Sequence, residues 1–117
     1  MTITLYGIPN CDTVKKARAW LAGNGIEHVF HDFKKSGVTR PMLQAWLADI
    51  AWETLLNRRG TSWRGLPQER RDAVGNADDA IALMLENPSL IKRPVLVKDG
   101  KACCGYGESQ YRDLFQR

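Results

Sequence analysis

One cysteine, Cys11, lies where the chain changes from a predicted strand to a predicted helix. Residues 2–6 alternate apolar and polar types, residues 7–10 have the composition of a tight turn, and helix-compatible residues follow. The first N–H groups of a helix lack partners and, with the helix dipole, favour negative charge. The position therefore predicts a thiol with a lowered pKa and a nucleophilic sulfur. A free cysteine can also be a small buried hydrophobic residue, but this position favours the reactive interpretation.

Two lysines, Lys15 and Lys16, follow within about one turn of the predicted helix. Lysines there oppose the helix dipole, so they contribute little to helix stability. Their presence makes sense if the site must be electropositive, either to stabilise a thiolate or to bind an anion. Asp12 works partly against this, although it could serve as an N-cap.

Length and composition indicate a single domain spanning residues 1–117, with the apolar content of an ordinary globular protein. We expect neither a transmembrane helix nor a signal peptide, because the chain lacks a long apolar run and a basic segment followed by one. Three cysteines, of which Cys103 and Cys104 are adjacent, do not resemble a secreted disulfide framework, so we expect a cytoplasmic protein with reduced thiols. The net charge of +4 suits an anionic small molecule or an acidic partner, and is too small to argue for nucleic acid.

Hydrophobic periodicity predicts an α/β order: strand, helix, strand, a run of helices, then strand, strand, helix. Thr39 and Pro41 mark the start of the helical run, Asp99-Gly100 is a hairpin signal, and residues 57–65 predict a polar, basic loop. The predicted strands are 2–6, 26–33, one into which residues 90–97 lead, and 101–104. The helices flanking them are 13–22 and 108–115. We expect a four-stranded mixed sheet with an all-helical insert, approximately residues 39–88, between strands two and three.

Three segments in this order resemble the ArsC/Spx family of the thioredoxin superfamily, and most closely its YffB-type branch. These segments are Tyr6-Gly7-Ile8-Pro9-Asn10-Cys11-Asp12-Thr13, Leu55-Leu56-Asn57-Arg58-Arg59-Gly60 and Asn87-Pro88-Ser89-Leu90-Ile91-Lys92-Arg93-Pro94-Val95. The resemblance runs nearly from end to end and implies a thioredoxin-like fold. It also implies a cis peptide bond before Pro94 and pairing of the adjacent backbone with a bound peptide or glutathione.

The family's arsenate reductases use the helix-start cysteine and three arginines, which this chain matches only in part. Cys11 matches the cysteine and Arg93 the second arginine, whereas the first falls on Asn57 and the third on Gly105. Each bidentate arginine contact to an oxyanion contributes roughly 1.5–3 kcal/mol, so the resemblance implies poor arsenate turnover. The Cys-x-x-Cys switch of Spx regulators is also absent, because Val14 occupies its second position.

These observations predict an enzyme: a glutathione-dependent thiol-disulfide oxidoreductase with Cys11 as its catalytic residue. Glutathione is the expected co-substrate, with no tightly bound cofactor or metal, and glutaredoxin is a further candidate partner. The substrate would be a small-molecule or protein disulfide, or an oxyanion. For Arg59 a solvated surface arginine is an equally good interpretation. The expected substrate and glutathione contacts are Asn10, Lys15, Asn57, Arg59, Arg93 and Pro94.

Several alternatives stay open at this point. Cys104 could resolve a disulfide on Cys11, while a neighbouring thiol on the opposite face of the strand would belong to the core. The basic segment 58–64 could be a flap over the end of the sheet or, less simply, a nucleic-acid patch. The chain could instead be a Spx-like protein that contacts RNA polymerase, or a genuine glutaredoxin-linked arsenate reductase. His28 and His31 have no further metal ligand at a useful spacing.

Overall fold

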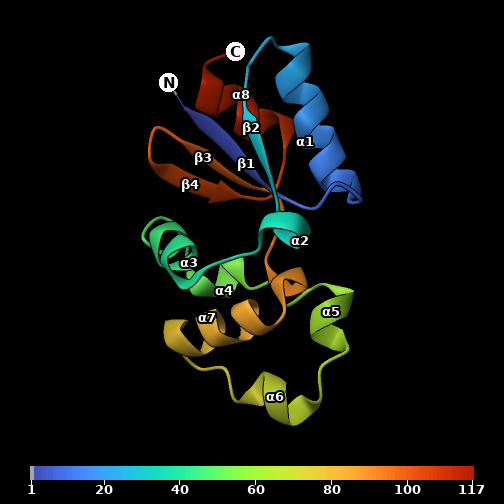
Figure 1. The fold of residues 1–117 in the computed structure, drawn as a ribbon, viewed down its shortest axis with the longest axis vertical. Coiled ribbons are helices and arrows are strands. Elements are labelled where there is room, and N and C mark those ends of the chain that lie inside the picture. Colours follow the sequence, from blue (N-terminus) through green and yellow to red (C-terminus); the bar gives the residue numbers. More distant parts are fainter. Residues whose placement is uncertain (1) are drawn as a thin grey trace. The chain divides into compact units, whose positions relative to one another are not determined.

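The computed structural model describes residues 2–117, and the chain divides into two compact units (Figure 1). One unit combines the N-terminal residues up to 36 with residues 93–117, and the other comprises residues 37–92. The helical insert expected at about 39–88 falls within the second unit.

The first unit contains the sheet. Its strands lie in the order β2-β1-β3-β4, with β1 parallel to β2 and antiparallel to β3, and β3 antiparallel to β4. This arrangement confirms the expected four-stranded mixed sheet and the thioredoxin-like fold. The elements of this unit are β1 (Ile3–Gly7), α1 (Asp12–Gly23), β2 (Val29–Asp32), α2 (Phe33–Ser36), β3 (Val95–Lys98), β4 (Lys101–Cys104) and α8 (Glu108–Phe115).

Alternation along the strands determines which side chains form the core of this unit. Leu5 of β1 lies opposite Leu96 of β3, which lies opposite Cys103 of β4, so these three side chains share one face of the sheet. The helices α1 and α8 cover that face. The buried residues of this cluster are Ile3, Leu5, Ala17, Leu21, Ile26, Leu96 and Tyr111. Each fully buried leucine stabilises the fold by about 1.5–3 kcal/mol, which keeps α1 in place against the sheet.

The second strand is shorter than the sequence predicted. Instead of residues 26–33, β2 covers Val29–Asp32, and Phe33 begins the short helix α2. The carboxylate of Asp32 accepts a hydrogen bond from the N–H of Lys34 at 2.8 Å, which is the geometry of a helix N-cap. The buried ring of Phe33 therefore contributes to the core from a helix rather than from a strand.

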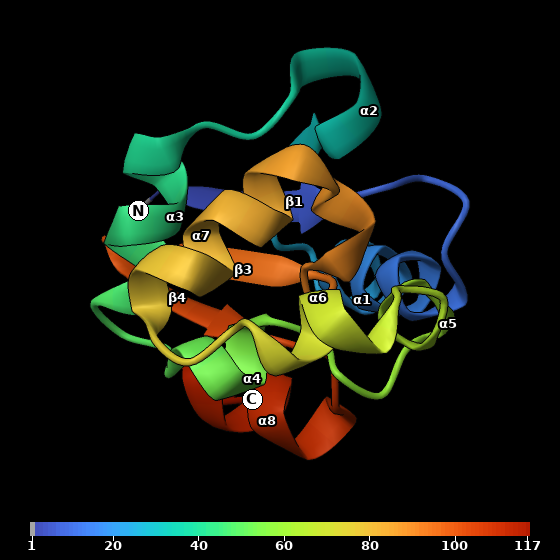
Figure 2. The ribbon, with the colours of Figure 1, turned by 90° about the horizontal axis from the view of Figure 1, so that it is seen from below.

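The second unit is helical, as expected. The Oγ1 of Thr39 accepts a hydrogen bond from the N–H of Met42 at 3.4 Å, which confirms the predicted N-cap. The longer helices α3 and α7 both carry buried side chains, and they pack side by side (Figure 2). The elements of the second unit are α3 (Arg40–Leu47), α4 (Trp52–Leu55), α5 (Thr61–Arg64), α6 (Gln68–Asp72), α7 (Ala77–Glu86) and the 3-10 turn η1 (Pro88–Leu90).

The predicted loop at 57–65 is only partly a loop, because α5 occupies Thr61–Arg64. The preceding segment is paired: the N–H of Asn57 donates to the carbonyl of Leu90 at 2.7 Å, and the N–H of Lys92 donates to that of Leu55 at 2.8 Å. These two hydrogen bonds fix residues 55–57 beside residues 90–92 within the helical unit.

Candidate functional site

The end of β1 and the start of α1 bring the Cys11 sulfur to a helix N-terminus. Cys11 is the N-cap of α1, with an extended backbone, and its carbonyl accepts the N–H of Lys15 at 2.9 Å. Gly7 permits a close approach here, because a Cβ at this position would lie 2.8 Å from the Cγ2 of buried Val14. The turn therefore places the sulfur near the unpaired N–H groups of the helix, as the sequence predicted.

The surroundings of Cys11 favour its thiolate form. Partial burial acts to raise the pKa of the thiol, but the N–H of Val14, the guanidinium of Arg93 and the N–H of Thr13 outweigh it, and the pKa is lowered. The Cys11 side chain itself forms no capping hydrogen bond with α1. The side chain is half-buried. A half-exposed thiol with a lowered pKa is the combination that reactive cysteines share.

The positive charge that acts on the sulfur comes from Arg93, which the sequence placed near it only by resemblance. Arg93 precedes β3 and is half-buried, and the Arg93–Pro94 peptide bond is cis, as the resemblance implied. The carbonyl of buried Pro94 accepts the N–H of Gly105 at 2.8 Å, which ties the start of β3 to the end of β4. The sheet thereby fixes the backbone that directly follows Arg93.

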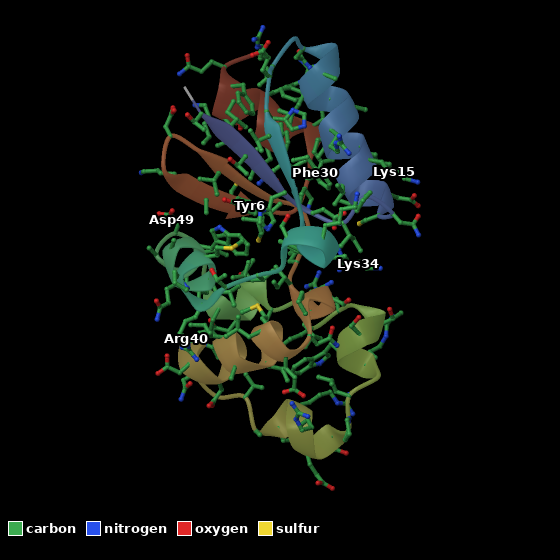
Figure 3. The ribbon with its side chains drawn as sticks, in the orientation of Figure 1. Tyr6, Lys15, Phe30, Lys34, Arg40 and Asp49 are labelled. Atoms are coloured by element: carbon green, nitrogen blue, oxygen red, sulfur yellow. The ribbon has the colours of Figure 1, made fainter. Side chains whose placement is uncertain are left out.

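The other expected contacts near Cys11 are at the surface. Lys15 and Lys16 are exposed and are not among the groups that lower the thiol pKa, so the expectation that they stabilise the thiolate has no support here. Figure 3 shows Lys15 on the outer side of α1. Asn10 is also exposed, directly before the cysteine. Their expected contacts with an anionic substrate stay predictions.

Asn57 and Arg59 belong to the helical unit, where they lie next to each other. The side-chain oxygen of Asn57 accepts the N–H of Arg59 at 3.2 Å, which closes a turn before α5. Together with Lys92 they line a pocket whose residues all belong to that unit. The sequence did not mark Lys92, and only the pairing of residues 55–57 with residues 90–92 brings it there.

The two adjacent cysteines differ in their surroundings. Cys103 lies opposite Leu96 and Cys104 opposite Val95, so the thiols lie on opposite faces of the sheet, as alternation predicts. Burial, and secondarily the neighbouring Cys104, raise the pKa of Cys103 against a hydrogen bond with Gln110 that lowers it. All three cysteines of the chain are free of disulfides. Cys103 is therefore a poor nucleophile near neutral pH, and the resolving role of Cys104 stays a prediction.

Residues 2–117 contain neither a metal-binding cluster nor a membrane-spanning helix. No group of three or more His, Cys, Asp or Glu side chains in this range could hold a metal ion. No helix in it is long and apolar enough to cross a membrane, since α1 has 12 residues and a span needs about 20.

Comparison with known proteins identifies the family. The model of the ArsC family matches residues 6–114, which include Cys11, Arg93 and the helical unit. The chain belongs to the ArsC family. An uncharacterised protein of Haemophilus influenzae is 42% identical over 113 residues, covering 97% of this chain and 98% of that relative. The global transcriptional regulator Spx of Streptococcus pyogenes is 26% identical over 117 residues, covering 98% of this chain and 86% of the regulator.

Solved ArsC-family structures match over nearly the whole length. The YFFB protein is 44% identical with a TM-score of 0.91, covering 96% of this chain and 97% of that one. An arsenate reductase (ArsC) related protein from Brucella melitensis is 49% identical with a TM-score of 0.78, covering 100% of this chain and 97% of that one. These likenesses establish an arsenate-reductase-like fold of the kind that carries thiol chemistry.

Proposed function

We propose that this ArsC-family protein is a thiol-disulfide oxidoreductase that uses Cys11 as its only catalytic nucleophile and glutathione as the resolving thiol. The observation that carries the proposal is the lowered pKa of a half-exposed thiol at the N-terminus of α1 with Arg93 beside it. A thiolate is the attacking species in disulfide exchange, and stabilising it at neutral pH is what these groups do.

The reaction proceeds through mixed disulfides. The Cys11 thiolate attacks one sulfur of a disulfide substrate, forms a bond to it, and expels the other sulfur as a thiolate that takes up a proton. A glutathione thiolate then attacks the Cys11 sulfur, releases the second half of the substrate, and remains attached as Cys11–glutathione disulfide. A second glutathione thiolate attacks the glutathione sulfur and releases oxidised glutathione and the Cys11 thiolate. Two glutathione molecules supply the two electrons and the two protons that the reduced substrate gains.

Three side chains support an anionic co-substrate for Cys11. Arg93 carries a positive charge close to the sulfur, and Lys15 and Asn10 are exposed on either side of the cysteine in the chain. Glutathione carries two carboxylates, and a guanidinium binds a carboxylate through paired, charge-assisted hydrogen bonds. The low pKa of the Cys11 thiol also makes it a good leaving group when the second glutathione attacks an adduct.

The test is formation and turnover of the glutathione adduct. Incubation with oxidised glutathione should add one glutathione to the wild-type chain and to Cys103→Ser, and none to Cys11→Ser, as read from intact mass. Cys103→Ser is the matched control, because it removes a half-buried thiol of raised pKa by the same chemical change. Addition of reduced glutathione should then release the adduct. Equal labelling of Cys11→Ser and the wild type would exclude this mechanism.

A second candidate function is supported by the likeness to the regulator Spx, which covers 98% of this chain. A regulator of that kind would act by binding a protein partner such as RNA polymerase, without turnover. Recovery of RNA polymerase from lysate equally by wild type and Cys11→Ser, with no glutathione adduct on the wild type, would favour this function over the first.

Arsenate reduction by Cys11 has less support than disulfide exchange. The resemblance to the reductases aligns Asn57 and Gly105 with two of their three arginines, and neither side chain carries a charge. We expect coupled arsenate turnover to stay near that of Cys11→Ser, while disulfide exchange does not.

A further inference from the structure

A pocket of about 520 Å³ lies entirely within the helical unit. The end of α4, the turn before α5, and Lys92 form its wall. Two independent pairings define that wall: the side-chain turn between Asn57 and Arg59 at 3.2 Å, and the backbone hydrogen bond of Lys92 to Leu55 at 2.8 Å. The pocket is large enough for a small organic molecule.

Positive charge dominates the lining. Arg58, Arg59 and Lys92 contribute three cations, and Glu53 contributes the single carboxylate, which leaves a net charge of +2 (three positive minus one negative). All four side chains are exposed at the surface. Within residues 2–117 none of these three cations takes part in an ion pair, whereas arginines and lysines elsewhere do, as Arg70 does with Glu86 at 2.7 Å.

An apolar wall accompanies the charges. Trp63 of α5 is half-buried and lines the pocket, with the buried side chain of Leu56 beside it. The guanidinium of Arg58 lies 5.7 Å from the ring centre of Trp52, which orients it by a cation–π contact. An indole and an aliphatic side chain next to unpaired guanidinium groups can accept a ring and a charged head group together.

We propose that this pocket binds a small organic dianion that carries a flat apolar ring. The two negative charges match the net charge of the lining, and the ring packs against Trp63. A phosphate monoester and a dicarboxylate share this chemistry, because guanidinium groups bind both head groups through paired hydrogen bonds. The proposal goes beyond the disulfide chemistry of Cys11, and gives Asn57 and Arg59 a ligand other than glutathione.

The test uses two aromatic dianions, phenyl phosphate and phenylsuccinate, on the full chain. Titration of each is followed by the NMR signal of the Trp63 indole N–H, assigned by its loss in Trp63→Phe, and by calorimetry. At least one of the two should shift that signal in a saturable manner and more strongly than inorganic phosphate, which lacks the ring. Stronger binding of phenyl phosphate would identify a phosphate site, and stronger binding of phenylsuccinate would identify a dicarboxylate site.

Three substitutions distinguish a site from general charge attraction. Arg59→Ala should weaken binding of the better probe by about tenfold or more, as expected when one charge-assisted hydrogen bond is lost. Arg40→Ala removes the same charge from the same unit, at an exposed position outside the pocket, and should change the affinity less than twofold. Glu53→Gln should tighten binding, because it removes the one negative charge of the lining. If the substitution only damaged the pocket, it would weaken binding of the probe rather than tighten it.

Further controls separate this proposal from the catalytic one. Cys11→Ser should bind the probe as the wild type does, so the outcome does not depend on the thiol. Oxidised glutathione should not displace the probe, and displacement would assign the pocket to the substrate of Cys11 instead. The proposal is overturned if neither probe shifts the Trp63 signal, or if Arg40→Ala and Arg59→Ala weaken binding equally.

Discussion

Removal of the Arg93 guanidinium should change the reactivity of Cys11 in opposite directions at low and high pH. Arg93→Met keeps an apolar chain in a half-buried position while it removes the positive charge and the hydrogen-bond donor. A hydrogen bond to a charged group contributes roughly 1.5–3 kcal/mol, and the lower end applies because the sulfur is half-exposed. About 1.4 kcal/mol corresponds to a factor of ten, so the thiolate fraction should fall about tenfold at pH values below the thiol pKa.

The more basic thiolate that remains is also more nucleophilic. With a Brønsted coefficient of about 0.4–0.5, a tenfold loss of thiolate is accompanied by an increase of about threefold in the rate constant of each thiolate. Arg93→Met should therefore react about three- to fourfold more slowly than the wild type at low pH. Above the thiol pKa of both proteins it should react about threefold faster. The two pH–rate profiles should cross.

The assay is the rate of adduct formation with an uncharged disulfide, hydroxyethyl disulfide, measured by intact mass across the pH range. An uncharged reagent is needed because Arg93 would also attract an anionic one. The background carries Cys103→Ser and Cys104→Ser so that only Cys11 reacts. Lys15→Met is the matched control and should leave the profile unchanged, because Lys15 is not among the groups that lower the pKa. Superimposable profiles for Arg93→Met and the wild type would refute the role given to the guanidinium.

Three further predictions concern stability, and each is checked by urea denaturation. Because folding lowers the pKa of Cys11, the thiolate adds stability above the unfolded thiol pKa of about 8.5 and this contribution is lost as the pH falls through the folded pKa. The difference in free energy of unfolding between the wild type and Cys11→Ser should therefore grow with rising pH, and a difference independent of pH would contradict the lowered pKa. Gly7→Ala should destabilise the fold by about 1–3 kcal/mol, because its Cβ would lie 2.8 Å from the Cγ2 of Val14, and an unchanged midpoint would show that the turn relaxes. Asn76 is the N-cap of α7, and its Oδ1 accepts the N–H of Asp79 at an N···O distance of 2.8 Å, against 3.4 Å for the cap at Thr39. Thr39→Ala should therefore cost about 0.5 kcal/mol and Asn76→Ala about 1–2 kcal/mol. Equal losses would indicate that cap distance is not what matters.

Signals that act over a few residues predicted the elements well. Thr39 with Pro41 located the start of α3, and Asp99-Gly100 located the hairpin between β3 and β4, where both residues have positive φ. The closing helix runs over Glu108–Phe115 as predicted. In each case the preferred backbone conformation of one or two residues decides the outcome, and the rest of the fold agrees with it.

Two predicted elements were wrong, for different reasons. Residues 26–33 look like one strand because apolar residues recur in them, but Asp32 caps α2 and ends the strand early. The acidic residue followed by a short run to Gly37, which has a positive φ, was the signal that could have located this helix. The short helix α5 was missed because its residues carry no apolar periodicity, and pairing of the preceding segment with residues 90–92 fixes it instead.

The sequence predicted the contribution of the residues next to Cys11 in the chain, but not that of a residue far from it in the chain. The turn from β1 to α1 was enough to predict a lowered pKa for Cys11. Proximity in sequence suggested Lys15 as the source of positive charge, although a residue one turn along a helix can point to the outside. Arg93 entered only through resemblance, because its nearness to the sulfur depends on the pairing of β1 with β3. The spacing of residues in the sequence does not reveal which strands pair.

The backbone conformation of the turn after β4 restricts which side chains position 105 can carry. The resemblance to arsenate reductases aligns their third arginine with Gly105, which here is buried and has a φ of 79°. An arginine would be strained in that backbone conformation, and the N–H of this residue is committed to the carbonyl of Pro94 at 2.8 Å. Gly105→Arg would therefore supply a charge only together with strain of about 1–3 kcal/mol in the turn. In this chain, the conformation that lets Gly105 close the end of the hairpin is therefore also the one that disfavours a charged side chain there.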